Sequence, residues 1–526
     1  MGGCDLDNGV VKARLGPLTA LLLSIAAGPL PIAAQGTTAI VGATIIDGNG
    51  GRPLADGTIV VEGTRIVDIG PRAAVAVPDE ARALDGRGKF VIPGLIDTNV
   101  HMSLAFSWDE TNARYWDRHE ELILQGAQLQ LKYGVTSVRD SYGALLPMIR
   151  VRDAIERGEV VGPRMHVAGN IVGWGGPYSR TFSWRSENEL TYFQEQVNDH
   201  ITLASGEELM HMTLDELRAA MNNYLDKGPD FIKYGGSSHG TYPSLIGFSP
   251  EAQQVIVEET QKRGLVAEIH TKGFEGLKLS ILAGIDLIQH PDAVGYREIT
   301  DELVKLIVDR GIICSMLPNK YTGEVWRNYL EEREAARKKW TELRNTRKAP
   351  LTSAEIRRMV QETGWEHPET VLGQDLEMRR RNGKKLIEAG CIVTVGADNL
   401  LFGSGGGAPE FRRELNRTDH LDPGVGTIRA IEGLVELGMT PSDALVAATR
   451  NGALAFKALD EFGTLEVGKL ADLLVLSADP LADISNLRKL ETIMKEGRLI
   501  DPDSLPTDAV TPDWERRRIT LKKERL

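Results

Sequence analysis

The chain of 526 residues lacks an excess of positive charge, is poor in cysteine and contains no repeated or low-complexity segment. Its 61 basic residues are outnumbered by 74 acidic ones, and the net charge of −13 leaves no sequence-wide basic face for nucleic acid. The remaining composition, 42% hydrophobic and 26% charged, is typical of a globular protein. At this length the chain has room for a large barrel and a smaller attached domain.

Cysteine occurs at only three positions, and Cys4 lies in a predicted leader segment. The other two, Cys314 and Cys391, stand in apolar runs that are typical of strands. Free cysteine in such runs usually behaves as a small buried hydrophobe. We therefore expect two buried thiols and no disulfide.

The sequence also lacks an apolar run of the roughly 20 residues that a membrane-spanning helix needs. The N-terminal run is shorter, and Pro17 and Pro29 interrupt it. The N-terminus has the three parts of an export signal in their usual order. The basic residues Lys12 and Arg14 come first, then the apolar stretch from Leu18 to Ile25, and then the pair Ala33-Ala34. We expect residues 1–34 to be a signal peptide, the mature protein to be periplasmic or secreted, and no stable membrane anchor.

Both ends of the mature chain show short β segments separated by turn signals. The N-terminal segments are 39–46, 58–62 and 66–69, and the C-terminal ones are 463–465, 472–476 and 492–495, after a helical stretch over 441–458. We expect residues 35–90 and 455–526 to form one composite β-sandwich domain, with residues 91–454 as a separate unit between them.

Residues 91–454 alternate buried apolar runs with amphipathic helical stretches, which predicts an α/β fold with parallel strands covered by helices. Eight strands are expected, as in a (β/α)8 barrel: 90–100, 135–139, 164–168, 230–234, 265–270, 285–290, 311–316 and 391–398. The charged stretch 321–381 interrupts this rhythm between the last two strands. It is either a helical lid over the barrel mouth or a solvated helical hairpin with no part in catalysis.

Five of these strands end in polar side chains, at the edge of the barrel where active sites lie. Asn99 and His101 close the first strand and, being two residues apart, lie on one face. The other strand-end residues are Lys233, His270, His290 and Asp398. Each alone has an ordinary explanation as a core, salt-bridge or cap residue. Their convergence on one ring instead indicates a cation site, because zinc prefers imidazole and carboxylate ligands.

Two segments resemble signatures of the amidohydrolase superfamily, in its branch of imidazolonepropionases and prolidase-like enzymes. They are the strand-one motif from Val91 to His101 and the segment from Gly463 to Leu476, preceded by Ala448 to Ala453. The resemblance implies a divalent metal ion held by residues at the ends of the strands, with a carboxylated lysine among the ligands: His101, Lys233, His270, His290 and Asp398.

Asn99 departs from the His-x-His pattern that is common in this family. The Asn-x-His form resembles the subgroup of bacterial phenylurea hydrolases and molinate hydrolase. An amide oxygen binds zinc more weakly than imidazole does. We therefore expect one tightly held zinc ion and a second, weaker position.

Aromatic residues cluster in loops at the predicted barrel mouth. Such clustering favours a pocket for a flat or lipophilic group, although the same rings also serve to pack long loops onto a barrel. The candidate pocket residues are Trp108, Trp174, Tyr178, His239 and Tyr242. A dipeptidase would need a carboxylate clamp, for which Arg180 and Arg185 are the candidates.

We expect a hydrolase that drives metal-activated water onto an amide-, urea- or carbamate-like C–N bond of a small aromatic or lipophilic substrate. Asp398 would take the proton of the water and pass it to the leaving nitrogen, with Lys233 as the second catalytic residue. The alternatives are a metallo-dipeptidase of the prolidase-like type and a non-catalytic barrel scaffold. The sequence leaves open whether the chain forms a homo-oligomer.

Overall fold

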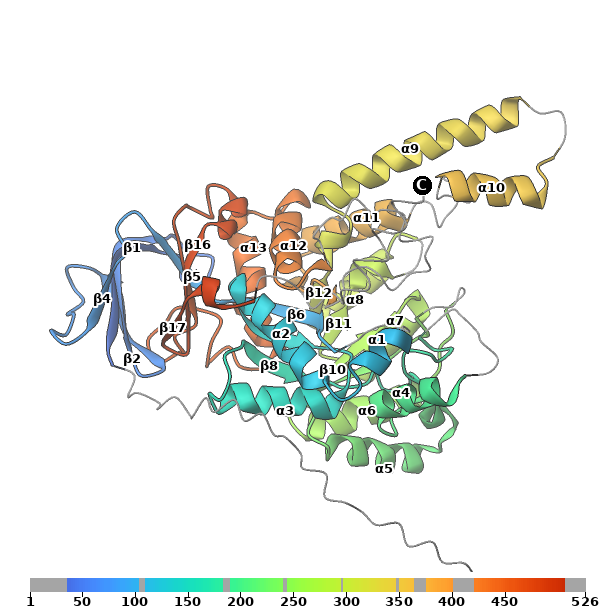
Figure 1. Cartoon of the computed structure of the whole chain (residues 1–526), viewed down its shortest axis with the longest axis horizontal. Coiled ribbons are helices and arrows are strands. Elements are labelled where there is room, and N and C mark those ends of the chain that lie inside the picture. The colour runs from blue at the N-terminus through green and yellow to red at the C-terminus, as the bar shows by residue number, and fades with distance from the viewer. Residues whose placement is uncertain are drawn as a thin grey trace, which may run out of the picture. The chain divides into compact units, whose positions relative to one another are not determined.

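A ring of parallel strands, each followed by at least one helix, forms the centre of the computed structural model (Figure 1). The structure describes residues 36–103, 109–182, 190–239, 244–294, 297–346, 350–363, 375–400 and 421–506. The ring strands are β6 (Leu95–His101), β7 (Val135–Asp140), β8 (Arg164–Val167), β9 (Phe231–Gly235), β10 (Val266–His270), β11 (Leu287–Gln289), β12 (Ile313–Met316) and β13 (Ile392–Val395), which continues as β14 (Asn399–Leu400).

Backbone hydrogen bonds close the ring at the two seams between its sheets, β9 to β13 and β14-β6-β7-β8. At one seam the N–H of Val172 donates to the carbonyl of Lys233 over 2.9 Å. At the other, the N–H of Asp398 donates to the carbonyl of Asn99 over 2.8 Å, and β14 pairs with β6. Gly396 is required here, because a Cβ would lie 2.3 Å from Ser315 Oγ. The predicted (β/α)8 barrel is confirmed.

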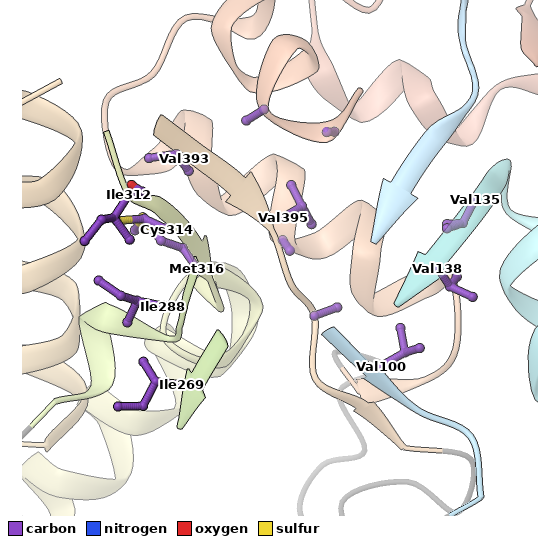
Figure 2. Close-up of a cluster of buried hydrophobic side chains, with 14 of the residues drawn as sticks. Val100, Val135, Val138, Ile269, Ile288, Ile312, Cys314, Met316, Val393 and Val395 are labelled. Atoms are coloured by element: carbon purple, nitrogen blue, oxygen red, sulfur yellow. The ribbon is translucent and has the colours of Figure 1, made fainter. Parts of the chain in front are cut away.

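Apolar side chains of strands and helices together form the largest hydrophobic cluster among the described residues. Figure 2 shows part of it, with Val100 and Val138 from β6 and β7 and Ile269 and Ile288 from β10 and β11. Cys314 belongs to the same cluster, and both it and Cys391 are free and buried, as predicted. The helices that follow the ring strands include α2 (His119–Lys132), α3 (Leu145–Glu156), α5 (Leu214–Leu225), α6 (Pro250–Lys262), α7 (Phe274–Ala283), α8 (Asp301–Asp309), α11 (Asp375–Glu388) and α12 (Val425–Glu436).

The two chain ends form a second sheet of eight strands, in the order β17-β16-β15-β5-β1-β2-β3, with β4 paired to β1. One hydrophobic cluster joins side chains from both ends, including Ile40, Val61 and Leu473. The composite β domain is thus confirmed. Its strands are β1 (Thr38–Ile45), β2 (Leu54–Glu62), β3 (Arg65–Pro71), β4 (Arg82–Asp85), β5 (Phe90–Pro93), β15 (Leu473–Leu476), β16 (Leu490–Lys495) and β17 (Arg498–Ile500).

Three predicted elements differ from the structure. The run 90–100 divides at Gly94 into β5 of the composite sheet and β6 of the barrel, because apolar periodicity does not tell which sheet a strand joins. Residues 463–465 form a turn segment rather than a strand. The helix over 441–458 is divided at Thr449 into α13 (Pro441–Ala448) and α14 (Arg450–Ala455).

The predicted helical insertion contains α9 (Gly323–Asn345) and α10 (Ser353–Thr363), which lie side by side (Figure 1). They share a small core of Ala336, Trp340 and Met359. The last helix of the insertion, α11, begins at Asp375 and contacts the turn Pro291–Ala293 after β11, so it belongs to the barrel wall. The role of the insertion as a lid stays a prediction. In the described ranges, no helix is both long and apolar enough to span a bilayer.

Candidate functional site

The predicted strand-end histidines and Asp398 form two close pairs at the barrel mouth. His101 Nε2, at the end of β6, lies 2.7 Å from Asp398 Oδ1, in the link between β13 and β14. His270 Nδ1, at the end of β10, lies 2.9 Å from His290 Nε2, which follows β11. All three imidazoles are buried, whereas the Asp398 side chain is 22% exposed. Asp398 is therefore the member of these pairs that solvent and a substrate reach most easily.

Lys233 and Asn99 are linked through Ser141, which follows β7. The Lys233 ammonium donates to Ser141 Oγ over 3.0 Å, and the Ser141 hydroxyl donates to Asn99 Oδ1. All three side chains are buried. This chain of hydrogen bonds fixes the oxygen of Asn99 in β6 and the amine of Lys233 in β9 relative to each other, through the residue that follows β7.

Two of the strand-end residues have a left-handed backbone, with φ of 42° at His290 and 51° at Asp398. Side chains other than glycine adopt this region rarely, and each such residue costs about 1–3 kcal/mol. Such strain persists where the surrounding structure enforces it, which is common at functional sites. In both residues the turn occurs where the strand ends.

The three imidazoles are neutral at pH 7. Burial lowers the pKa of His101, and it lowers the pKa values of His270 and His290 well below the usual range. The positive charge of Lys233 lowers all three further. A neutral imidazole keeps a lone pair on one ring nitrogen, which is the form that binds a metal ion.

Asp398 is ionised, because Lys320 offsets the effect of burial. Burial alone would raise the pKa of Asp398, but the adjacent Lys320 ammonium and the hydrogen bond from His101 hold it well below its usual range. Lys320 ends the short turn Pro318–Lys320 after β12 and contacts Asp398 Oδ2 directly. Burial also lowers the pKa of Lys233, against the opposing charges of Glu268 and Asp398.

The chemistry of these donors fits a divalent cation. His270 Nε2 and His290 Nδ1 are buried and have no hydrogen-bond partner within the described ranges. The direct hydrogen bond between the two rings occupies one nitrogen of each, so both rings can offer lone pairs only when that bond opens. Within the described ranges, no three His, Cys, Asp or Glu side chains lie close enough together to hold one ion in this arrangement.

An aromatic wall lies beside the histidine pair. The Trp174 ring centroid is 4.6 Å from that of His270 and 5.7 Å from that of Phe182, and the His239 ring stacks on Phe182 at 5.0 Å. Trp174 packs over Gly235 at the end of β9, where a Cβ would lie 2.2 Å from its indole nitrogen. The indole N–H donates to the carbonyl of Ser237. We call Trp174, Phe182 and His239 the aromatic wall.

The other predicted pocket residues have different surroundings. Tyr178 accepts a hydrogen bond from Asn112 of α1 (Asp109–Arg114), and its backbone N–H donates to Asn198 of α4 (Tyr192–Thr202). These bonds tie the loop after β8 to two helices. Arg180 is exposed. Trp108, Tyr242 and Arg185 lie outside the described residues.

Three residues that the sequence analysis did not single out contact the predicted site: Ser141, Tyr142 and Lys320. Ser141 and Tyr142 directly follow β7, which ends in Arg139-Asp140. The rule that picked out the other strand ends applies equally to this one and would have found both. Lys320 stands four residues after β12, and its position in the sequence carries no comparable signal.

Below the mouth, the barrel interior holds an ion pair with no solvent exposure. Arg139 Nη2 lies 2.8 Å from Glu268 Oε2, and both side chains are 0% exposed. Gln289 donates to the other carboxylate oxygen of Glu268 over 3.0 Å and also to the carbonyl of Thr98. We call Arg139, Glu268 and Gln289 the inner layer. Each oxygen of its carboxylate has a partner.

Comparisons with known proteins agree with this architecture. The structure of molinate hydrolase is 29% identical, covers 90% of this chain and 96% of its own, and has a TM-score of 0.75. Phenylurea hydrolase B is 28% identical, with coverage of 91% and 100% and a TM-score of 0.74. Ochratoxinase from Aspergillus niger is 23% identical over 479 residues, which are 88% of this chain and 86% of that protein. Residues 90–500 match the amidohydrolase family, whose members generally depend on a divalent metal, and the chain belongs to this family of hydrolases acting on C–N bonds.

Proposed function

We propose that the chain hydrolyses a non-peptide C–N bond, of the amide, urea or carbamate type, in a small substrate that carries a flat aromatic or lipophilic group. The aromatic wall is the observation that carries this proposal. It places the rings of Trp174 and His239 directly beside His270, with Phe182 packed against both of them. Ring faces bind flat apolar groups well and offer little to the charged ends of a dipeptide. The likeness to hydrolases of phenylurea and of molinate supports the same substrate class.

We propose that one zinc ion is held by His101, His270, His290 and Asp398 together with Lys233, with Asn99 at a weaker second position. When bound, the ion lowers the pKa of water towards about 7 and polarises the substrate carbonyl. The lowered pKa of Lys233 favours its neutral amine. A neutral amine adds carbon dioxide and releases a proton, which turns this residue into an anionic ligand. The neutral imidazoles and the unpartnered nitrogens described above support this assignment.

Asp398 acts as the general base in this proposal. Its low pKa keeps it ionised at neutral pH, and its side chain is the partly exposed member of the two close pairs. It accepts a proton from the attacking water and delivers it to the leaving nitrogen, because an amide nitrogen departs poorly unless it is protonated. His101 orients the carboxylate through the hydrogen bond to Oδ1.

The test is a hydrolysis screen of zinc-loaded protein against aryl amides, phenylureas, carbamates and dipeptides. Turnover is measured as the release of free amine. We expect turnover of at least one of the first three classes and none of the dipeptides. Turnover of dipeptides alone would establish the prolidase-like alternative. Failure with every class, together with an absence of bound metal, would establish the scaffold alternative.

We also propose that the protein is exported. The order of basic residues, apolar run and paired alanines in residues 1–34 supports this, and these residues lie outside the described part of the chain. N-terminal sequencing of the protein recovered from fractionated cells tests it. We expect the mature chain to begin at Gln35 and to leave the cytoplasm, whereas an intact N-terminus in the cytoplasmic fraction would refute export.

A further inference from the structure

Tyr142 connects the two halves of the candidate site. It is the second residue after β7, and its ring lies 6.4 Å from the His101 ring, centroid to centroid, in an edge contact. The same ring lies 6.0 Å from Trp174 and 5.3 Å from Phe182. Tyr142 therefore contacts both a proposed ligand of the cation and the aromatic wall, and a substrate held by both would lie next to it.

The hydroxyl of Tyr142 is buried and has no hydrogen-bond partner among the residues that the structure describes. The Tyr321 hydroxyl, beside Asp292, is unmatched as well, but two further buried tyrosines differ in this respect. The Tyr224 hydroxyl donates to the carbonyl of Ala168 and accepts from the N–H of Asn170, and the Tyr234 hydroxyl donates to Gln253. An unmatched buried hydroxyl destabilises a fold, and phenylalanine would fill the same space without that penalty. The fold of the protein alone gives no reason for the Tyr142 oxygen.

We propose that Tyr142 determines substrate specificity, by donating a hydrogen bond to an acceptor oxygen of a bound urea or amide. This inference takes its class of substrate, a urea or amide with a flat group, from the proposed function and rests on it. A substrate whose flat group lies against Trp174 would bring a polar group next to the Tyr142 ring. A site built around a buried donor rejects analogues that lack the acceptor, because they leave the donor unmatched.

Binding of phenylurea tests the proposal without requiring turnover. Calorimetric titration would compare zinc-loaded Asp398→Asn protein with the double variant Asp398→Asn/Tyr142→Phe. We expect the dissociation constant to rise about five- to tenfold in the double variant, as for the loss of one neutral hydrogen bond. Equal affinity in the two proteins, or no saturable binding to either, would overturn the proposal.

Thermal stability separates this role from a structural one. Tyr142→Phe should melt at the same temperature as the unmodified protein or higher, because no protein partner is lost. Tyr234→Phe is the matched control, since it removes a hydroxyl that does have a partner. It should melt at a lower temperature and bind phenylurea with an unchanged dissociation constant. If Tyr142→Phe melts as low as this control, the hydroxyl has a partner in the protein and the proposal is wrong.

The proposed function can fail independently of this inference. Turnover of phenylurea by the unmodified protein is measured in the hydrolysis screen, whereas the role of Tyr142 is measured by binding to a variant without the general base. Binding that depends on Tyr142 in a protein that hydrolyses none of the compounds would refute the proposed function and support the specificity role.

Discussion

The inner layer and the mouth of the barrel are both buried and polar, but they differ in how their titratable groups are matched. In the inner layer, Glu268 has a partner for each oxygen and is paired with Arg139, although Arg139 Nε and Gln289 Oε1 have no hydrogen-bond partner within the described ranges. Two residues further along β10, towards the mouth, His270 Nε2 has no partner there either. A buried carboxylate that is paired with a cation and fully hydrogen-bonded needs no further ligand, whereas a neutral imidazole with a free ring nitrogen can bind one. The paired charges of the inner layer therefore indicate a structural role, and the free imidazole nitrogens at the mouth indicate a binding role.

The largest effect on the rate of hydrolysis should come from a substitution at the barrel mouth. Asp398→Asn removes the proposed general base, and kcat on the best substrate of the screen should fall about 10²- to 10⁴-fold. Much of the metal should remain, because the other ligands are kept. Steady-state kinetics and metal analysis of the same sample would measure both. Asp286→Asn is the control, since Asp286 precedes β11 at the opposite end of the barrel, and it should change kcat less than about twofold. A near-normal rate for Asp398→Asn would refute the role.

The inner layer should instead govern stability. Arg139→Met leaves Glu268 buried without its cation, which should lower the free energy of unfolding by about 3–5 kcal/mol. Replacing both residues by methionine should restore most of this loss, because the unpaired charge is gone. Denaturant-induced unfolding would compare the single and double variants. If the single variant is as stable as the unmodified protein, the inner layer does not have the structural role that separates it from the mouth.

Lys320 should affect the pH dependence of the mouth more than its maximal rate. It lowers the pKa of Asp398, so Lys320→Met should raise that pKa. The base then becomes protonated at a higher pH, and the acid limb of the kcat/KM profile should move upwards in pH. Lys320→Arg keeps the charge and should retain the original profile. The role assigned to Lys320 is contradicted if the profile of the methionine variant coincides with that of the unmodified protein.

A smaller effect, on the pH dependence of stability, is expected from a histidine pair outside the candidate site. His119 Nδ1 of α2 lies 3.2 Å from His200 Nε2 of α4. Burial, with a further contribution from His200, lowers the pKa of His119 from 6.5 to about 4. The unfolded chain therefore takes up a proton before the folded one as the pH falls. The associated stability is complete above about 6.5 and is lost between 6.5 and about 4.

His119→Gln should make the loss of stability between pH 7 and pH 5 smaller, by about 1 kcal/mol. Unfolding curves of metal-free protein at the two pH values would measure this without interference from the cation site. An equal loss in the variant and in the unmodified protein would show that His119 does not carry this part of the pH dependence.

The barrel and the positions of the site residues were predictable from local sequence patterns. The run 135–139 became β7, and the polar residues at the strand ends placed His101, His270, His290 and Asp398 at the same end of the barrel. Pairings across the ring were not predictable, because no local pattern relates His101 to a partner almost 300 residues away. Nor did the apolar run 90–100 reveal that its two halves belong to different sheets. The strand-end rule would have pointed to Tyr142 as well, but that its hydroxyl lacks a partner is visible only once the neighbouring side chains are in place.

The proposed function requires residues from distant parts of the chain to share one divalent cation at the barrel mouth. Metal analysis by mass spectrometry of protein purified without chelators tests it most directly, on the unmodified protein and on His270→Ala, His290→Ala and Glu268→Gln. We expect about one ion per chain, its loss in both histidine variants, and its retention in Glu268→Gln. An unmodified protein without stoichiometric metal, or histidine variants that keep the metal, would refute the shared cation site.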